Sequence, residues 1–360
     1  MADLQEIVDD LEAEIRRPIS VEDRRWRLLA HSVQPAEADP VRRSSILTRE
    51  TSPEVAAWLE GLGLKRAREL VDLPANDELG MRRRGCLPIR HGDALLGFLW
   101  VIVGDRPLTP SEREAITRSG EEVARNLWER RRAADERRER TIAHLEALLQ
   151  GRPGAARELA DTLRWPETGG AYAIAVTDVD PDRLRRRRGD LAWTGTTILA
   201  RDPAKLAESL EQAGATGGVS ATFADLAQAP EALNQAKIAA LCAPALNQRV
   251  ATYDRLGSWA LVATLWDGAG RPEPPPPITQ LAAHRRAQPL LDALEGLLEH
   301  GGDVAAAAAA LSMHRATLYR RLERVEEITG LDLANGDDRL LAHIGLRILK
   351  LATAVASTRD

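Results

Sequence analysis

Two short segments near the C-terminus, 305–311 and 315–325, constrain the fold more than any other part of the chain. The first is almost entirely alanine, and the second carries four arginines within ten residues. An alanine-rich helix allows a second helix to cross it closely, and a basic second helix fits the major groove of DNA. The pattern predicts a helical pair joined by a tight turn, with one side of the second helix exposed.

Turning the second helix at about 100° per residue separates a core stripe from an outer face. The apolar residues share one sector, which is the predicted core stripe: Leu311, Leu318, Leu322 and Val325. Opposite the core lie Ala316, Arg320 and Glu323. Thr317 and Arg324 flank this outer face on one side, and Tyr319 flanks it on the other. Arg315 and Arg321 lie nearer the edges of the core stripe. A small residue and an arginine facing outward, bordered by hydroxyl and guanidinium groups, suit base readout flanked by phosphate contacts.

An ordinary helical hairpin with surface arginines is the alternative. From Gln288 to Asp360, eight Arg or Lys residues stand against eleven Asp or Glu residues, so this region is slightly acidic. Four of the eight positive charges nevertheless lie between Arg315 and Arg324. A solvated helix face normally interleaves charges of both signs. The concentration favours nucleic-acid binding, restricted to this patch.

A family resemblance appears at these residues. The run from Leu311 to Val325, followed by Thr329-Gly330-Leu331-Asp332-Leu333, resembles the C-terminal helix-turn-helix of the PucR/CdaR family of bacterial transcription regulators. The family pattern also has a preceding helix, here Leu290 to His300, and a long apolar helix afterwards, here Arg339 to Val355. The resemblance implies a regulator whose partner is double-stranded operator DNA.

The residues predicted to contact DNA are His314, Arg315, Ala316, Thr317, Tyr319, Arg320, Arg321 and Arg324. Two of them depart from the family. Ala316 stands where relatives often carry Asn, and Arg320 stands where many carry Tyr. Both lie on the predicted outer face, so the base preference of relatives is not carried over.

Composition limits the remaining possibilities. With 360 residues, 44% hydrophobic and 29% charged, the chain is typical of a soluble protein of two or three domains. A net charge of −5 argues against a general polyanion binder. Two distant cysteines, Cys86 and Cys242, favour a reducing cytoplasm over a disulfide framework or a cysteine zinc site. The acidic start has no apolar signal core, and the apolar stretches 94–103 and 344–355 are too short or too charged to span a bilayer. We therefore expect a cytoplasmic protein.

The first block, residues 1–129, reads as a mixed α/β domain. The expected elements are a helix at Leu4–Ile15, a strand at Trp26–Ser32, helical segments at Glu54–Leu59 and Arg66–Leu70, and a hairpin of Arg84–Arg90 with Ala94–Val103. A long helix follows Leu108, with Thr109 or Ser111 as its cap. The hairpin followed by this helix resembles the tail of a GAF-type sensor domain, best over Cys86 to Leu127. The resemblance implies a small-molecule effector, but the residues that would bind it are unknown.

Residues 130–150 are expected to continue that helix as a charged connecting segment. Leu127, Ala134, Leu145 and Leu148 give it a sparse apolar stripe. Two interpretations stay open, the seam of a parallel dimeric coiled coil and a lone connecting helix.

The middle block, residues 151–268, also reads as α/β. Its expected strands are Tyr172–Asp178, Thr196–Ala200, Gly218–Ala221 and Arg249–Tyr253, and its expected helices are Pro203–Ala213, Leu226–Leu241 and Ser258–Trp266. The order of these elements resembles the second half of the GGDEF-like domain that PucR/CdaR regulators carry. The segment Asp178–Asp190 lacks the Gly-Gly-Asp/Glu-Glu-Phe hairpin that holds GTP and Mg²⁺ in active cyclases, so cyclase chemistry is set aside.

Residues 269–287 read as a stiff Pro-rich linker that holds the last domain away from the middle block. The last domain, residues 288–356, is expected to be entirely helical. Its first helix should stop at Gly301-Gly302, and Asp303 should cap the alanine helix. His314 is expected to be an end cap or a phosphate contact.

The sequence shows no motif for catalysis, a cofactor or a metal. Its seven histidines lack ligand spacing, and Asp178, Asp180 and Asp182 beside Pro181 are more typical of a solvated loop. Cys86 is read as a buried structural thiol in preference to an oxidant sensor.

The prediction is a multidomain α+β fold: a GAF-like sensor, a degenerate GGDEF-like domain and an all-α helix-turn-helix domain. We expect a ligand-responsive, non-enzymatic transcription regulator that binds DNA as a dimer or higher oligomer. The alternatives are a protein–protein scaffold that keeps the helix pair without binding DNA and, more remotely, an enzyme acting through the middle domain.

Overall fold

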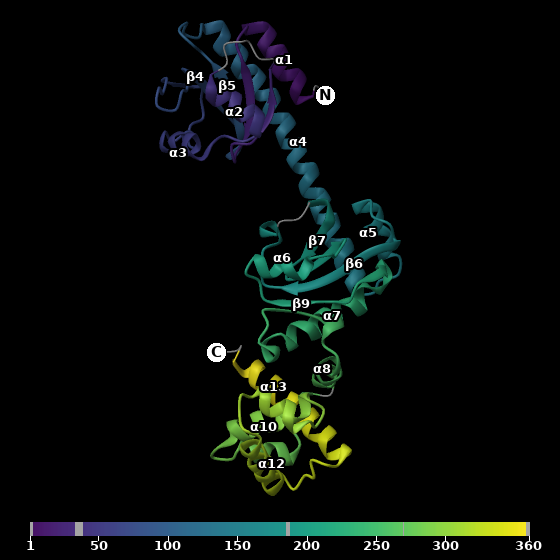
Figure 1. Cartoon of the computed structure of the whole chain (residues 1–360). Helices are drawn as coiled ribbons and strands as arrows, with labels where there is room; N and C mark the ends of the chain where they lie inside the picture. The colour runs from purple at the N-terminus through teal and green to yellow at the C-terminus, as the bar shows by residue number, and fades with distance from the viewer. Residues whose placement is uncertain (1–2, 33–38, 185–187, 269, 358–360) are drawn as a thin grey trace. The chain divides into compact units, whose positions relative to one another are not determined.

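The N-terminal part of the computed structural model begins with α1 (Leu4–Ile15), the amphipathic helix expected there, and Asp3 and Glu6 form its capping box. The structure describes residues 3–32, 39–184, 188–268 and 270–357. The chain divides into two compact units, residues 1–137 and 138–360, and α4 (Pro110–Leu149) contributes residues to both (Figure 1). The predicted α+β class with a helical C-terminal region is confirmed.

Within the described residues, the first unit has a sheet in the order β2-β1-β5-β4-β3, and all neighbouring strands are antiparallel. The strands are β1 (Ile19–Asp23), β2 (Leu28–His31), β3 (Val71–Leu73), β4 (Arg84–His91) and β5 (Ala94–Ile102). The predicted hairpin is confirmed as β4 and β5, which close with His91 opposite Ala94. The strand expected from Trp26 starts later, because Trp26 has a φ of 63° and lies in the turn between β1 and β2.

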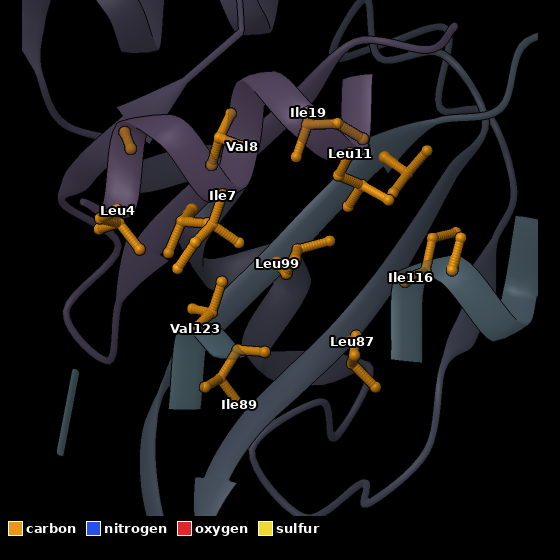
Figure 2. Close-up of a cluster of buried hydrophobic side chains, with 14 of the residues drawn as sticks. Leu4, Ile7, Val8, Leu11, Ile19, Leu87, Ile89, Leu99, Ile116 and Val123 are labelled. Atoms are coloured by element: carbon orange, nitrogen blue, oxygen red, sulfur yellow. The ribbon is translucent and has the colours of Figure 1, made fainter. Parts of the chain in front are cut away.

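Helices α1 and α4 cover one face of this sheet with an apolar core (Figure 2). Because side chains alternate across a strand, every second residue of the central strands points to this face. The core joins Ile19, Leu87, Ile89 and Leu99 of the sheet to Leu4, Ile7, Val8 and Leu11 of α1 and to Ile116 and Val123 of α4. Gly120 brings α4 close, since a Cβ there would lie 2.4 Å from Cδ2 of Leu87.

The opposite face of the sheet packs against α2 (Pro40–Thr48) and α3 (Pro53–Gly61) through a cluster that includes Val41, Val55 and Leu59. Trp26 stacks on Phe98 there, with ring centroids 4.3 Å apart. The helix predicted at Arg66–Leu70 is absent, and these residues are irregular after a turn that ends at Arg66. Edge strand β3 begins directly afterwards, so its pairing with β4 leaves too few residues for a stable helix.

The predicted continuation of α4 through the charged segment is confirmed, with residues 129–140 all exposed. Of the two interpretations left open for the apolar stripe, its burial favours the connecting helix over the dimer seam. Leu127 is buried in the core of the first unit, while Leu145 and Leu148 are buried in a core of the second unit. Three of the four seam residues are therefore used inside the chain, and Ala134 alone of the four is exposed.

The middle block has a sheet in the order β11-β9-β6-β8-β7, with β10 also pairing with β6. Its strands are β6 (Thr168–Thr177), β7 (Leu191–Thr194), β8 (Thr197–Arg201), β9 (Gly217–Val219), β10 (Phe223–Asp225) and β11 (Val250–Thr252). Its helices are α5 (Ala155–Leu163), α6 (Leu206–Gln212), α7 (Ala229–Cys242) and α8 (Ser258–Gly268). A Cβ on Gly218 would lie 2.1 Å from the backbone nitrogen of Ala240, so glycine lets α7 lie directly on β9.

Five helices follow among the described residues: α9 (Pro276–Ala282), α10 (Ala287–Glu299), α11 (Val304–Ala310), α12 (Arg315–Thr329) and α13 (Gly336–Ser357). Their shared core contains Leu290, Leu294 and Leu297 of α10, Leu318, Leu322 and Val325 of α12, and Ala342 and Leu346 of α13. This is the all-helical module that the sequence predicts.

The linker expected over 269–287 is only partly a linker. Ile278 and Leu281, both fully buried, place α9 in the core of the helical module. Gly345 of α13 accommodates this helix, since a Cβ there would lie 2.7 Å from Cγ1 of Ile278. Among the described residues between α8 and α9, the segment without regular secondary structure is confined to residues 270–275.

Among the described residues, α13 is the one helix whose length and apolar composition would allow it to cross a membrane. Ala342, Leu346, Ile348 and Leu351 of this helix are buried against other helices of the second unit. Packing within the chain thus accounts for part of its apolar composition, whereas Leu340 and Leu341 are exposed.

Candidate nucleic-acid interface

Two side chains fix the ends of the helical pair. Asp303 caps α11 by accepting hydrogen bonds from the backbone N–H groups of Ala305 (2.7 Å) and Ala306 (3.1 Å), as predicted. The same hydrogen bonds lower the pKa of Asp303, with a smaller contribution from the charge of Arg315. His314 caps α12 through Nδ1, which accepts from the backbone N–H of Ala316 at 3.2 Å. Of its two predicted roles, the capping role is confirmed.

The close approach of the helices depends on small residues. Ala307 and Ala308 of α11 are buried against the neighbouring helices. Gly296 of α10 is equally constrained, since a Cβ there would lie 2.6 Å from Cδ1 of Leu311. The role of Gly296 could not be found from the sequence, because a single glycine inside a helical pattern carries no signal of its own about packing.

The predicted core stripe of α12 is confirmed at Leu318, Leu322 and Val325, which are buried, while Leu311 at the end of α11 is half-buried. The outer positions are exposed: His314, Arg315, Ala316, Thr317, Tyr319, Arg320 and Arg324. Arg321 is half-buried, at the edge of the core stripe as expected. Tyr319 exposes 53% of its surface.

The four arginines of α12 differ in their contacts. Arg321 donates from Nη1 to the backbone carbonyl of Pro289 at 3.3 Å, so it also fastens α12 to α10. Arg324 forms a salt bridge with Glu327 at 2.6 Å. In the described part of the chain, the guanidinium groups of Arg315 and Arg320 make neither a hydrogen bond nor a salt bridge. Their donors are available to a ligand.

Charge is distributed unevenly along α12. The exposed Glu323 and Glu327 lie in its second half, and Glu326 accepts a hydrogen bond from the backbone N–H of Leu333. From His314 to Arg321 there is no carboxylate, and three arginines are present. The first half of a recognition helix is the part that contacts base edges in helix-turn-helix complexes. The local field there is therefore positive although the module as a whole is acidic.

Other candidate chemistry finds little support. Asp178 accepts hydrogen bonds from the backbone N–H (2.7 Å) and the hydroxyl (2.9 Å) of Thr216, which accounts for its place beside β6. Among the described residues, no group of three His, Cys, Asp or Glu side chains could hold a metal ion. Cys86 is fully buried, and burial, reinforced by the charge of Glu22, raises the pKa of its thiol well above the ordinary value.

The geometry agrees with comparisons to known proteins. Residues 290–348 match the PucR C-terminal helix-turn-helix domain. The chain is 46% identical over 55 residues to the carbohydrate diacid regulator of Escherichia coli, covering 15% of this chain and 14% of that protein. It is 24% identical over 162 residues to the DNA-binding transcriptional activator AdeR of Bacillus subtilis, covering 44% of this chain and 38% of that protein.

A solved structure, the regulator of polyketide synthase expression from Bifidobacterium adolescentis, is 19% identical and covers 59% of this chain and 92% of that one, with a TM-score of 0.28. The chain spans well under half the length of the two curated relatives that it matches. The domain match covers the whole helical pair together with most of α10 and the first part of α13. The C-terminal region is therefore similar to the PucR type of helix-turn-helix domain, and through it the chain resembles the two curated regulators.

Proposed function

We propose that this protein regulates transcription by binding operator DNA through the first half of α12. The observation that carries the proposal is the exposed run from His314 to Arg320, free of carboxylates and backed by a buried apolar stripe. Arg320 on the outer face is suited to a base edge, whereas Arg315 near the core edge is suited to phosphate. The two curated relatives are described as transcription regulators, which supports the same assignment.

A single helix-turn-helix makes too few contacts for operator-grade affinity. We therefore infer that two copies bind paired half-sites in the cytoplasm. The antiparallel sheet of the first unit, covered by helices on both faces, supports its interpretation as a GAF-like sensor. The middle block fits a GGDEF-like domain without cyclase activity. A small-molecule effector in the sensor would shift the populations of two arrangements of the DNA-binding modules.

The test compares Arg320→Ala with Arg315→Ala in the full chain. Arg320→Ala should lose operator discrimination by about 1–3 kcal/mol, because a base contact is removed. Arg315→Ala should weaken operator and random DNA alike and reduce the salt slope of binding by about 1, because a phosphate contact is removed. Fluorescence anisotropy across a salt series, on an operator selected from a random library, measures both quantities.

Glu323→Ala is the matched control on the same face: removing its carboxylate should strengthen binding to operator and random DNA alike, because repulsion from phosphate is reduced. Its removal should leave discrimination unchanged. Equal losses for both arginine variants on both DNAs would contradict the division of roles. Absence of wild-type binding even at low salt would favour a protein–protein module instead.

A further inference from the structure

Helix α13 belongs to two hydrophobic clusters within the second unit. Ala342 and Leu346 pack into the core that contains α10 and α12. Ile348 and Leu351 pack instead against Trp259 and Val262 of α8 in the middle block. The helical module is therefore docked on the middle block, which corrects the expectation that a stiff linker holds the two apart.

Arg347 lies at the centre of this contact. Its Nη1 donates a hydrogen bond to Oγ of Ser258 in α8, and its Cζ lies 5.1 Å from the centroid of the Trp259 ring. Its Nη2 lies 3.5 Å from a carboxylate oxygen of Glu299 at the end of α10. The side chain is only 12% exposed. One guanidinium thus joins three helices through a hydrogen bond, a cation–π contact and an ion pair.

Glu299 receives a second contact from α13, since Nε2 of His343 lies 3.2 Å from the same carboxylate oxygen. Burial alone would raise the pKa of Glu299, but His343 and Arg347 together lower it. Lys350 pairs with Glu295 one turn earlier on α10. Helices α10 and α13 are therefore held together by ionic contacts on one side as well as by their shared core.

The connection continues to the DNA-contacting face. Leu290, Leu294 and Leu297 of α10 pack against α12, and Arg321 of α12 bonds to the carbonyl of Pro289. Helix α8 therefore contacts α13, α13 contacts α10, and α10 supports α12. Packed helices transmit a change of position because cores do not deform continuously.

We propose that Arg347 is a positioning residue that holds the helix-turn-helix module in one orientation on the middle block. The proposal rests on the proposed function for its effect on DNA: in a two-copy complex, this orientation sets the spacing of half-sites that both α12 helices can reach. Without Arg347, each module keeps its own fold and its contacts with one half-site. The preference for one spacing then weakens.

The experiment uses full-length wild type, Arg347→Ala, Arg347→Lys and the control Lys350→Ala. The control removes a cation that joins α13 to α10 and leaves the α8 contact intact. The first readout is amide hydrogen exchange without DNA. Arg347→Ala should speed exchange in α8 and the facing part of α13, with α12 unchanged, whereas Lys350→Ala should leave α8 protected. Lysine should restore little, because it lacks the planar fork that reaches three partners.

The second readout is affinity for paired half-sites at varied spacing. Arg347→Ala should reduce the preference for the best spacing by about 3- to 30-fold, the usual range for residues that couple two sites, with unchanged affinity for a single half-site. If Arg347→Ala also speeds hydrogen exchange in α12, Ser258→Ala serves as the second variant. It removes the same hydrogen bond from the α8 side and leaves the residues of the helical module unchanged.

Wild-type exchange in α8 for Arg347→Ala and Ser258→Ala overturns the proposal. So does an unchanged spacing preference. If the wild type binds no DNA, the proposed function fails and the positioning role in DNA binding falls with it, while the exchange data still decide whether Arg347 holds the module on the middle block.

Discussion

The helix-turn-helix module and the N-terminal unit place their charges in opposite ways. In α12 the arginines lie on the outside, over a core of leucine and valine. In the N-terminal unit, Glu22, Asp39, Arg42 and Arg84 are buried on the face of the sheet that α2 and α3 cover. Exposed charge is available to a polyanion and contributes little to folding. Buried charge contributes to folding only while every partner is present.

The buried group forms a connected layer. Arg84 donates from Nη2 to both carboxylate oxygens of Asp39, each at 2.8 Å. Glu22 accepts hydrogen bonds from Nε1 of Trp100 at 3.1 Å and from the hydroxyl of Thr51 at 3.3 Å. The opposite face of the same sheet is apolar. The difference indicates that the free energy of unfolding of the N-terminal unit depends on the protonation of its buried charged groups. That of the helical module depends on the packing of its apolar core.

The largest effect should come from breaking the buried pair. Asp39→Ala leaves the guanidinium of Arg84 buried without its carboxylate, which should lower the free energy of unfolding of the N-terminal unit by about 3–5 kcal/mol. Urea unfolding followed by hydrogen exchange of β4 and β5 measures this. Asp39→Asn serves as the control for volume. A loss below about 1 kcal/mol would mean that the pair behaves like a surface salt bridge.

A smaller, pH-dependent effect should come from Glu22. Burial, outweighing the opposing charge of Arg84, raises the pKa of this carboxyl from its ordinary 4.5 to about 7. Between these values the unfolded chain releases the proton while the folded unit retains it, so the free energy of unfolding falls by about 3 kcal/mol as pH rises. Glu22→Gln should abolish this slope, as read from urea midpoints across pH 4.5–7.

Glu112 provides an internal reference for that measurement. Its burial would raise its pKa, but hydrogen bonds from Arg17, the Thr109 N–H and Arg106 outweigh burial and hold the pKa at about 2. Its stabilising contribution is therefore lost below pH 4.5, outside the window of Glu22. An unchanged slope between pH 4.5 and 7 in Glu22→Gln would assign that slope to other groups.

The smallest effect on the free energy of unfolding should come from an exposed salt bridge of α12. Arg324→Ala removes a solvent-exposed ion pair with Glu327 and should lower the free energy of unfolding of the helical module by less than about 1 kcal/mol. Thermal unfolding monitored by hydrogen exchange of α12 provides the measurement. A loss as large as that of Asp39→Ala would remove the contrast between the two regions.

Local periodicity predicts the structure correctly where one helix or hairpin buries a single face. The stripe Leu318, Leu322 and Val325 repeats at helical spacing, so periodicity alone predicts which side of α12 is buried. The apolar run of β5 and the turn before it predict the hairpin in the same way. The exposed positions of α12 follow directly from that stripe, and their contacts with DNA remain a prediction.

Local periodicity fails where the partner of an apolar residue is distant in the sequence. Leu145 and Leu148 have the spacing of a coiled-coil seam, but their partners are β-strands and helices of the middle block. Ile278 and Leu281 form too short a pattern among prolines to reveal a helix. The contacts of Arg347 with Ser258, 89 residues earlier, are likewise invisible to local periodicity.

The packing of Ile278 against Gly345 limits how far the helical module can move from the middle block. Because α9 is packed into the helical module, the segment that connects the middle block to the module is short, from about Gly270 to Pro275. Gly270 and Arg271 have positive φ values, and the N–H of Arg271 donates to the carbonyl of Trp266. The remaining four residues, 272–275, would extend about 12 Å as polyproline. A module released from α8 would therefore stay close to the middle block, which would keep a search for a half-site local.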